Sequence, residues 1–232
     1  MSEYDRCIFD TCICIERGNT SDQREIMSNK ARFWDRIATK YFQQPINDEA
    51  AYERKLELTR EKLSKDSNVL EFGCGTGGTA LKHARFVKHI LATDISENML
   101  EIADRQKAEN GVENVTFQQA DFDTLTAPQV SFDVVLGMSI LHLLSDRRPA
   151  IAKVREMLKP GGYFITSTAC LGNKLWFMAP LLWGGRLIGR LPLVRIFTYG
   201  QLVDSLRDGG FEIEHEWVPG SGNSVFVIAR KP

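Results

Sequence analysis

Short apolar runs alternate with longer amphipathic stretches through most of the chain. The runs are rich in Val, Ile, Leu and Phe and are bounded by polar or glycine-containing segments, which predicts buried strands. The stretches between them place apolar residues at helical spacing. Strand and helix in alternation predict an α/β protein with a mostly parallel sheet. The predicted strands of this alternating core cover residues 68–72, 89–93, 115–119, 132–136 and 163–167.

Helices are also predicted on either side of this core. Residues 31–42 have apolar positions at helical spacing, and Asp48 is placed to cap a second helix. These two helices precede the core and could lie over its first turn. After the core, residues 199–208 predict a helix, and residues 211–217 and 224–230 predict two further strands.

Two segments fall outside this alternation. Residues 1–29 show no periodicity and are expected to be a loosely ordered N-terminal extension, with residues 30–232 forming a single domain. Residues 175–197 are strongly apolar, but their prolines and arginines exclude a simple transmembrane helix. We interpret residues 172–197 as an apolar, lid-like insertion between the fifth strand and the following helix.

Composition and charge exclude several functional classes. The chain has 232 residues, of which 43% are hydrophobic and 25% are charged, and its net charge of −1 gives no general attraction to nucleic acid. We see no secretory signal, and the odd number of cysteines argues against a disulfide framework. These features predict a cytoplasmic protein without a nucleic-acid partner. Three cysteines, Cys7, Cys12 and Cys14, lie close together in the sequence, but no second pair of Cys or His residues at ligand spacing accompanies them, so no metal site is expected.

A glycine-rich turn follows the first predicted strand. The spacing of Gly73, Gly75 and Gly78 matches the dinucleotide fingerprint G-x-G-x-x-G. Read from Glu71 to Gly77, the same segment is acidic-x-G-x-G-x-G, which resembles motif I of the class I S-adenosylmethionine-dependent methyltransferases. A carboxylate just before the turn would repel a pyrophosphate, whereas the ammonium and sulfonium of this methyl donor favour it. Glu71 therefore favours the methyltransferase interpretation.

Acidic residues stand at the ends of the next two predicted strands. A carboxylate at Asp94 can accept hydrogen bonds from the ribose hydroxyls of an adenosine ligand, although it could also simply cap the next helix. Ile95 and Met99 are placed to pack on the adenine face. In the family that motif I resembles, an acidic residue after the third strand accepts from the adenine amino group, and the backbone of the next residue reads the ring. Asp121 and Phe122 match this pattern.

Further segments carry the same resemblance. Residues 132–142 resemble the motif IV region of the family, and residues 158–164 resemble its turn into the fifth strand. The resemblance covers about residues 68–167 and is nearest to the small-molecule methyltransferases of ubiquinone and menaquinone biosynthesis. It implies a Rossmann-like, seven-stranded, mostly parallel sheet with an antiparallel last strand and helices on both faces. It also implies S-adenosyl-L-methionine as cofactor.

Absent motifs narrow the acceptor. The end of the fourth strand lacks Asn/Asp-Pro-Pro-aromatic, the motif of amino-group methylation on adenine or glutamine, and the acidic cluster of the metal-dependent catechol type, so no Mg²⁺ is implied. Tyr-x-x-x-Lys is absent, which disfavours the alternative of an NAD(P)-dependent oxidoreductase. A second alternative is a non-catalytic binding module on a methyltransferase fold.

We expect a small, lipophilic acceptor, because the apolar insertion at residues 172–197 would line the acceptor pocket if it covers that pocket as a lid. His142 is the histidine nearest the predicted reaction face, and its ordinary pKa of about 6.5 suits a general base, although packing between leucines is an alternative role. A further hypothesis is peripheral membrane contact through residues 175–197; the oligomeric state stays open. The expected donor site comprises Glu71, Gly73, Cys74, Gly75, Gly77, Asp94, Ile95, Met99, Asp121, Phe122 and Met138.

Overall fold

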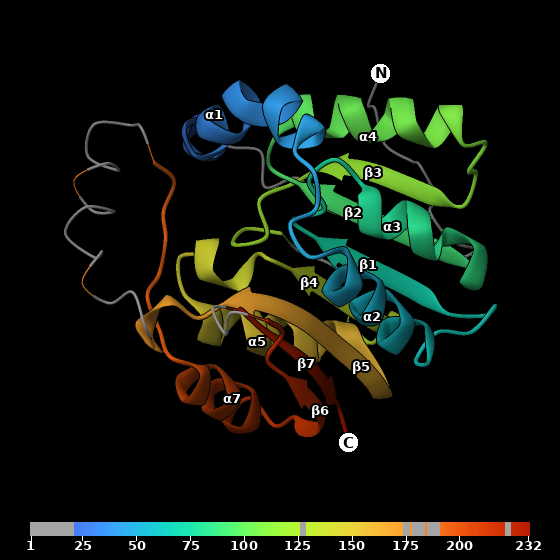
Figure 1. The fold of residues 1–232 in the computed structure, drawn as a ribbon, viewed down its shortest axis with the longest axis vertical. Helices are drawn as coiled ribbons and strands as arrows, with labels where there is room; N and C mark the ends of the chain where they lie inside the picture. Colours follow the sequence, from blue (N-terminus) through green and yellow to red (C-terminus); the bar gives the residue numbers. More distant parts are fainter. Residues whose placement is uncertain (1–20, 126–128, 174–176, 178–183, 185–190, 221–223) are drawn as a thin grey trace.

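The computed structural model describes residues 21–125, 129–173, 177, 184, 191–220 and 224–232. Within these residues, seven strands form one sheet in the order β3-β2-β1-β4-β5-β7-β6 (Figure 1). The first five strands pair in parallel, and β7 pairs antiparallel with both β5 and β6. This confirms the predicted fold class. The strands are β1 (Asn68–Phe72), β2 (His89–Asp94), β3 (Val115–Gln119), β4 (Phe132–Met138), β5 (Leu158–Ala169), β6 (Glu212–Trp217) and β7 (Ser224–Arg230).

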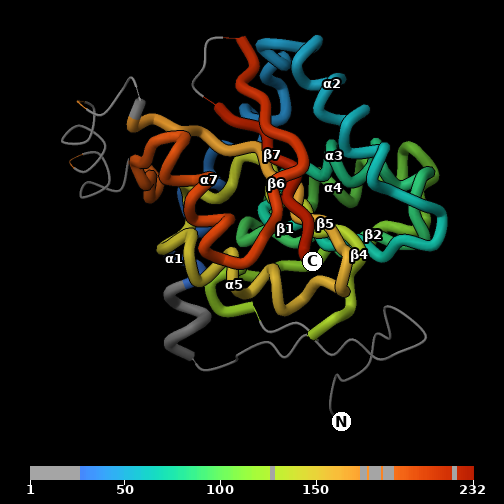
Figure 2. The backbone as a smooth tube through the Cα atoms, turned by 90° about the horizontal axis from the view of Figure 1, so that it is seen from below, coloured from blue at the N-terminus to red at the C-terminus, as the bar shows by residue number. Residues whose placement is uncertain are grey.

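Helices cover both faces of the sheet. The helices α2, α3 and α4 lie on one side, and α5 and α7 lie on the other (Figure 2). Helix α1 packs mainly against α4. The helices are α1 (Ser21–Gln43), α2 (Glu49–Arg60), α3 (Gly78–His83), α4 (Glu97–Glu109), α5 (Arg147–Met157) and α7 (Tyr199–Asp208), with short 3₁₀ turns η1 (Ala84–Phe86), η2 (Leu141–Leu143) and η3 (Leu171–Asn173).

The strands bury side chains on both faces because the parallel sheet lies between two helical layers. Leu70 and Phe72 of β1 point into the core under α5 and α7, whereas Val69 points into the core under α2, α3 and α4. Side chains alternate along a strand, so Glu71 shares the face of Val69. This places a carboxylate against α3, in a layer otherwise built from apolar residues.

Side-chain caps fix where the helices begin. Asp48 accepts a hydrogen bond from the backbone N–H of Ala51, and Ser96 accepts from Met99. Thr198 and Gln201 form a capping box at the start of α7. The cap predicted at Asp48 is therefore confirmed.

The N-terminal boundary differs from expectation. The predicted helix was to begin near residue 31, but α1 begins at Ser21, so residues 21–29 are helical. Later turns of α1 bury apolar side chains, such as Ala31 and Ala38, each 2% exposed. A helix anchored by those turns can extend through polar residues at little cost, and such residues carry no apolar periodicity. The expectation for residues 1–20 lies outside the described residues.

Most of the predicted insertion at residues 172–197 also lies outside the described residues. Among those described, the ring of Phe177 is 61% exposed and Phe197 is 2% exposed. The remaining described residues lead into α7, and residues 191–193 line a cavity described below. No helix among the described residues is long and apolar enough to cross a membrane.

Candidate active site

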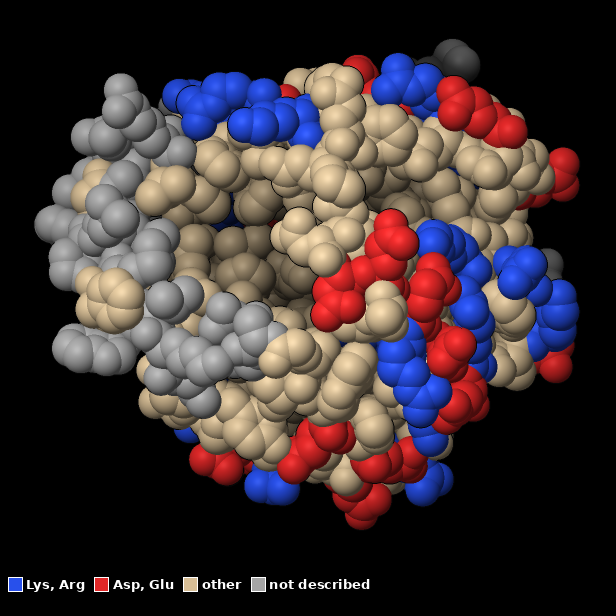
Figure 3. Space-filling model, in the orientation of Figure 1, with Lys and Arg blue, Asp and Glu red and all other residues tan. Residues whose placement is uncertain are grey.

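A cavity of about 720 Å³ opens at the C-terminal ends of the parallel strands. The strand order reverses between β1 and β4, and ligands of open α/β sheets bind at such a switch point. The cavity is the hollow left of centre in Figure 3. Its walls come from α1, from the loops after β1 to β4, and from residues 191–193. The predicted residues that line it are Gly73, Gly75, Asp94, Ile95, Met99, Asp121, Phe122, Met138 and His142.

The glycine turn between β1 and α3 has little room for side chains. Gly73 has φ +67°, and a Cβ there would lie 2.6 Å from Cγ1 of Ile140. Gly77 has φ +80°, and a Cβ there would lie 2.6 Å from Cζ of Phe117. Because both positions combine a left-handed backbone with close neighbours, only glycine fits. Gly77 serves the packing behind the turn rather than the cavity wall.

Cys74 also lies behind the turn. Its side chain is buried, and its backbone N–H donates to the carbonyl oxygen of Thr93 at 3.0 Å. Burial raises the pKa of the Cys74 thiol well above its usual value, so the thiol stays protonated at neutral pH. Cys74 therefore joins the turn to β2 through its backbone.

Asp94 ties the ends of β1 and β2 together. Its Oδ2 accepts from the backbone N–H of Gly75 at 2.8 Å, and its Oδ1 accepts from that of Ser96 at 2.9 Å. Burial raises the pKa of Asp94, while these backbone hydrogen bonds oppose the rise. Each carboxylate oxygen can accept more than one hydrogen bond, so Asp94 keeps acceptor capacity toward the cavity.

Glu71 is a buried carboxylate without sufficient compensation. It is 1% exposed, and its Oε2 has no hydrogen-bond partner within the described part of the chain. Burial and the nearby Asp94 raise the pKa of Glu71 to about 8, against a backbone hydrogen bond from Ala80 that lowers it. A bound cation would relieve this cost, because it stabilises the ionised carboxylate. Glu71 is not among the described residues that line the cavity, and its electrostatics favour a nearby cation, such as an ammonium group, over a pyrophosphate.

The loop after β3 carries the third predicted acidic position. Oδ1 of Asp121 accepts from the backbone N–H of Asp123 at 3.0 Å, and Oδ2 accepts from Nζ of Lys30 at 2.7 Å. The ring of Phe122 stacks on Phe72 with centroids 3.9 Å apart. The stacking fixes the loop against the core, and Phe122 is among the residues that line the cavity.

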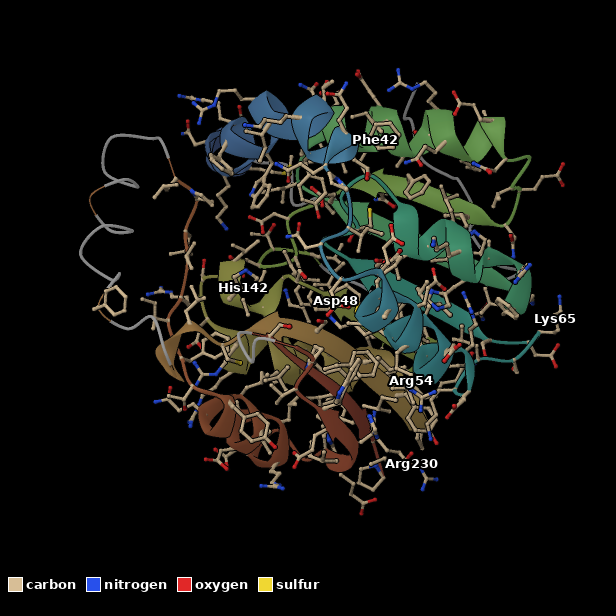
Figure 4. The ribbon with its side chains drawn as sticks, in the orientation of Figure 1. Phe42, Asp48, Arg54, Lys65, His142 and Arg230 are labelled. Carbon is tan, nitrogen blue, oxygen red and sulfur yellow. The ribbon has the colours of Figure 1, made fainter. Side chains whose placement is uncertain are left out.

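His142 lies on η2 beside the end of β4 (Figure 4). It lines the cavity, and its Nδ1 has no hydrogen-bond partner among the described residues. Burial lowers the pKa of His142 to about 4, so the imidazole is neutral at pH 7 but is a weaker base than its ordinary pKa of about 6.5 implies. Its neighbour Ser139 has φ +58°, an unusual conformation for a residue with a side chain, and it also lines the cavity.

Helix α1 supplies part of the wall that the sequence did not assign to the site. Lys30 bridges Asp121 and Asp123, at 2.7 and 2.8 Å. Tyr41 lies near Gly75, since a Cβ at Gly75 would be 3.8 Å from Cε1 of the Tyr41 ring. Sequence periodicity predicted a helix here but could not show which parts of the fold it covers. The α1 residues at the cavity are Asn29, Lys30, Arg32, Phe33, Trp34, Arg36 and Tyr41.

Comparison with known proteins agrees with this geometry. A family described as a methyltransferase domain matches residues 69–162, from β1 to the turn before the main part of β5. A demethylmenaquinone methyltransferase of Leptospira interrogans is 31% identical over 205 residues, which cover 77% of this chain and 82% of that protein. The chain belongs to the S-adenosylmethionine-dependent methyltransferases.

Other methyltransferases match in part or in fold. The uncharacterized methyltransferase YcgJ of Bacillus subtilis is 37% identical over 110 residues, which cover 47% of this chain and 44% of that protein. The chain therefore aligns with less than half the length of this relative. The crystal structure of an S-adenosylmethionine-dependent methyltransferase from Mesorhizobium loti superposes with a TM-score of 0.64 at 23% identity, covering 79% of this chain and 99% of that one. The cofactor of this methyltransferase is S-adenosyl-L-methionine, and the sheet is the Rossmann-like sheet of the family.

Proposed function

We propose that this methyltransferase holds its donor across the glycine turn and transfers the methyl group to a small, lipophilic acceptor in the same cavity. The observation that carries the proposal is the composition of the cavity wall. Strand-end carboxylates and the glycine turn form one part, while apolar residues of η2 and residues 191–193 form another. One connected space can therefore hold a polar donor and an apolar acceptor side by side.

The donor residues have distinct roles in this proposal. Asp94 binds the ribose hydroxyls, and Asp121 with the backbone of Phe122 binds the adenine edge. Ile95 and Met99 pack on the adenine face. Glu71 balances the positive charge of the donor ammonium through its Oε2, which has no hydrogen-bond partner among the described residues. Gly73, Cys74, Gly75 and Gly77 shape the turn beneath the donor, and Met138 at the end of β4 lies toward its methionine part.

The chain itself contributes alignment and proton transfer. When bound, the donor supplies a methyl group already activated on a sulfonium sulfur. The walls orient the acceptor and exclude water, which is the main source of rate acceleration when the reacting group is already activated. For an acceptor that must lose a proton, the neutral imidazole of His142 is the base.

The apolar wall supports a lipophilic acceptor. Ile140, Leu143 and Leu144 line the cavity from the β4 side, and Leu191 and Leu193 line it as well. The relative from Leptospira is named for demethylmenaquinone, a quinone-type substrate. The formal net charge of −1 gives no general attraction to nucleic acid, which supports a small-molecule partner.

Peripheral membrane contact through residues 175–197 is a further part of this proposal, although most of that segment lies outside the described residues. Its support is the apolar sequence with Arg186, Arg190 and Arg195, together with the exposed ring of Phe177. Sedimentation with vesicles containing anionic lipid at low salt tests it. Retention, with a shift in tryptophan fluorescence, is expected; a protein that stays in the supernatant would show that the segment does not bind membranes.

Calorimetry with S-adenosylhomocysteine, the demethylated product, tests the donor site. Asp94→Ala should weaken binding by about 1–3 kcal/mol, the scale of hydrogen bonds to a charged group. Asp104→Ala, on the exposed face of α4, is the control and should bind normally. Unchanged affinity in folded Asp94→Ala would refute the assignment. A methyl-transfer screen on lipophilic phenols and quinone precursors then tests the acceptor class.

A further inference from the structure

Three cationic side chains of α1 line the cavity: Lys30, Arg32 and Arg36. Figure 3 shows Lys and Arg side chains gathered over α1 beside the mouth of the hollow. Among the described residues, the other charged groups that line the cavity are the carboxylates of Asp94, Asp121 and Asp123. Whether the three cations are matched within the protein decides what they can bind.

Lys30 is fully matched. Its Nζ lies 2.7 Å from Asp121 and 2.8 Å from Asp123, and Asp123 also accepts from the hydroxyl of Ser145 at 2.6 Å. Asp94 accepts from two backbone N–H groups at the glycine turn and keeps its remaining acceptor capacity for the donor in the proposed function. The carboxylates of the cavity are therefore committed either to Lys30 or to the turn that carries the donor.

Arg32 and Arg36 have no such match. Neither forms an ion pair with any carboxylate whose side chain the structure describes, a set that does not include the side chains of residues 21–26. Arg32 donates to the amide oxygen of Asn29, and the guanidinium of Arg36 lies over the ring of Phe33 at 5.6 Å. The acidic residue between them, Asp35, instead accepts from the hydroxyl of Ser96 at 2.6 Å.

The two arginines are spaced to act together. They are about one helical turn apart on α1, so their side chains leave the helix on the same side. A guanidinium presents a planar set of donors that suits the oxygens of a carboxylate or phosphate. Contacts with Asn29 and Phe33 restrict the side chains, which lowers the entropy lost when an anion binds.

Apolar side chains line the same cavity as these arginines. They include Ile140 and Leu143 from the end of β4, and Leu191 and Leu193 from the segment before α7. A ligand that contacts both surfaces must be apolar along its body and anionic at one end. The positive charge of a bound donor adds to the same preference, because an anionic acceptor reduces the net charge in the site.

We propose that the acceptor carries an anionic oxyacid group, carboxylate or phosphate, which Arg32 and Arg36 bind at the cavity mouth while its apolar body lies against the leucine-rich wall. This inference rests on the proposed function, since it names the acceptor class of the same cavity. It goes beyond lipophilicity in requiring a negative charge. The arginines are binding residues for the acceptor and do not touch the donor.

Calorimetry on the complex with S-adenosylhomocysteine tests the proposal with a matched set of probes. The anions are octanoate, decanoate, dodecanoate and decyl phosphate, and the controls are decanol and decyltrimethylammonium. At least one of the anions should bind about tenfold or more tightly than decanol, the scale of a charge-assisted hydrogen bond. Decyltrimethylammonium should bind most weakly. Comparing decanoate with decyl phosphate identifies which oxyacid the site prefers.

The variant Arg32→Gln/Arg36→Gln should bind decanoate and decanol equally, with unchanged affinity for S-adenosylhomocysteine. Arg54→Gln is the matched control, because Arg54 lies on α2 away from the cavity (Figure 4) and should leave the preference intact. The proposal is overturned if no anion binds better than decanol, or if the preference persists in the double variant. Failure of S-adenosylhomocysteine itself to bind would instead refute the proposed donor site.

Discussion

Donor binding should strengthen as the pH rises from 6 to 8, because Glu71 must be ionised to attract the donor ammonium. Burial and the charge of Asp94 raise the pKa of Glu71 to about 8 in the ligand-free protein. A bound ammonium stabilises the carboxylate and lowers that pKa. Binding below pH 8 must therefore release a proton from Glu71.

The magnitude follows from the fraction of the protein that is ready to bind. With a pKa of about 8, roughly one molecule in ten is ionised at pH 7 and roughly one in a hundred at pH 6. The apparent affinity scales with this fraction, which is about one half at pH 8, so it should fall about fivefold between pH 8 and 7 and about tenfold, or about 1.4 kcal/mol, between pH 7 and 6. Near and above pH 8 the dependence should level off, because the Glu71 carboxyl is then largely ionised in the ligand-free protein as well.

Isothermal titration calorimetry with S-adenosylhomocysteine at pH 6, 7 and 8 measures this dependence. Repeating the pH 7 titration in two buffers of different ionisation enthalpy gives the number of protons released, which should approach one. Glu71→Gln keeps the shape of the side chain but cannot ionise. It should bind more weakly than wild type at pH 8 and should release no proton from this site.

The same pKa has an opposite effect on the stability of the ligand-free protein. A carboxyl whose folded pKa lies above its unfolded value stabilises the fold at low pH, and this stability is lost as the pH rises from 4.5 to about 8. Glu71→Gln should therefore unfold at a higher temperature than wild type at pH 8. A wild-type affinity independent of pH between 6 and 8, with normal binding by Glu71→Gln, would refute the reasoning.

Three further outcomes are expected. Lys30→Met should weaken S-adenosylhomocysteine binding several-fold, because the ion pair with Lys30 orients Asp121, and Lys30→Arg should restore the binding. Calorimetry measures both affinities, and equal affinities of wild type and Lys30→Met would refute this role of Lys30. Gly77→Ala should cost about 2–4 kcal/mol of unfolding free energy in urea melts, because its φ of +80° and the Phe117 ring oppose a Cβ. Gly200→Ala, which meets nothing within 4 Å, should not destabilise. For an acceptor that loses a proton, His142→Gln should lower kcat about 10²–10⁴-fold at saturating donor. The kcat of the wild-type enzyme should show no titration near pH 6.5, because the pKa of His142 is about 4. A kcat that His142→Gln retains would show that His142 is not the base.

The sequence by itself determined the sheet and predicted most of the strand-end residues that line the cavity. The bounds of β1, β3 and β7 agree with the prediction. Strands β1 and β7 are largely apolar runs, and β3 alternates apolar and polar residues at its start. The acidic residues at the strand ends were found from the same pattern, since parallel strands bring their C-terminal ends to one edge. Position relative to a strand is local information, and a local pattern is sufficient to predict it.

Only the tertiary structure decided what α1 does. Lys30 and Asp121 are 91 positions apart, and nothing near either residue in the sequence indicates that they pair. Arg32 and Arg36 appear from the sequence to be ordinary polar positions of an amphipathic helix. Packing of α1 on α4 brings both arginines to the cavity. The structure also shows that neither forms an ion pair with a carboxylate side chain that it describes. Contacts between distant segments depend on how whole elements pack, and periodicity within one element carries no information about its neighbours.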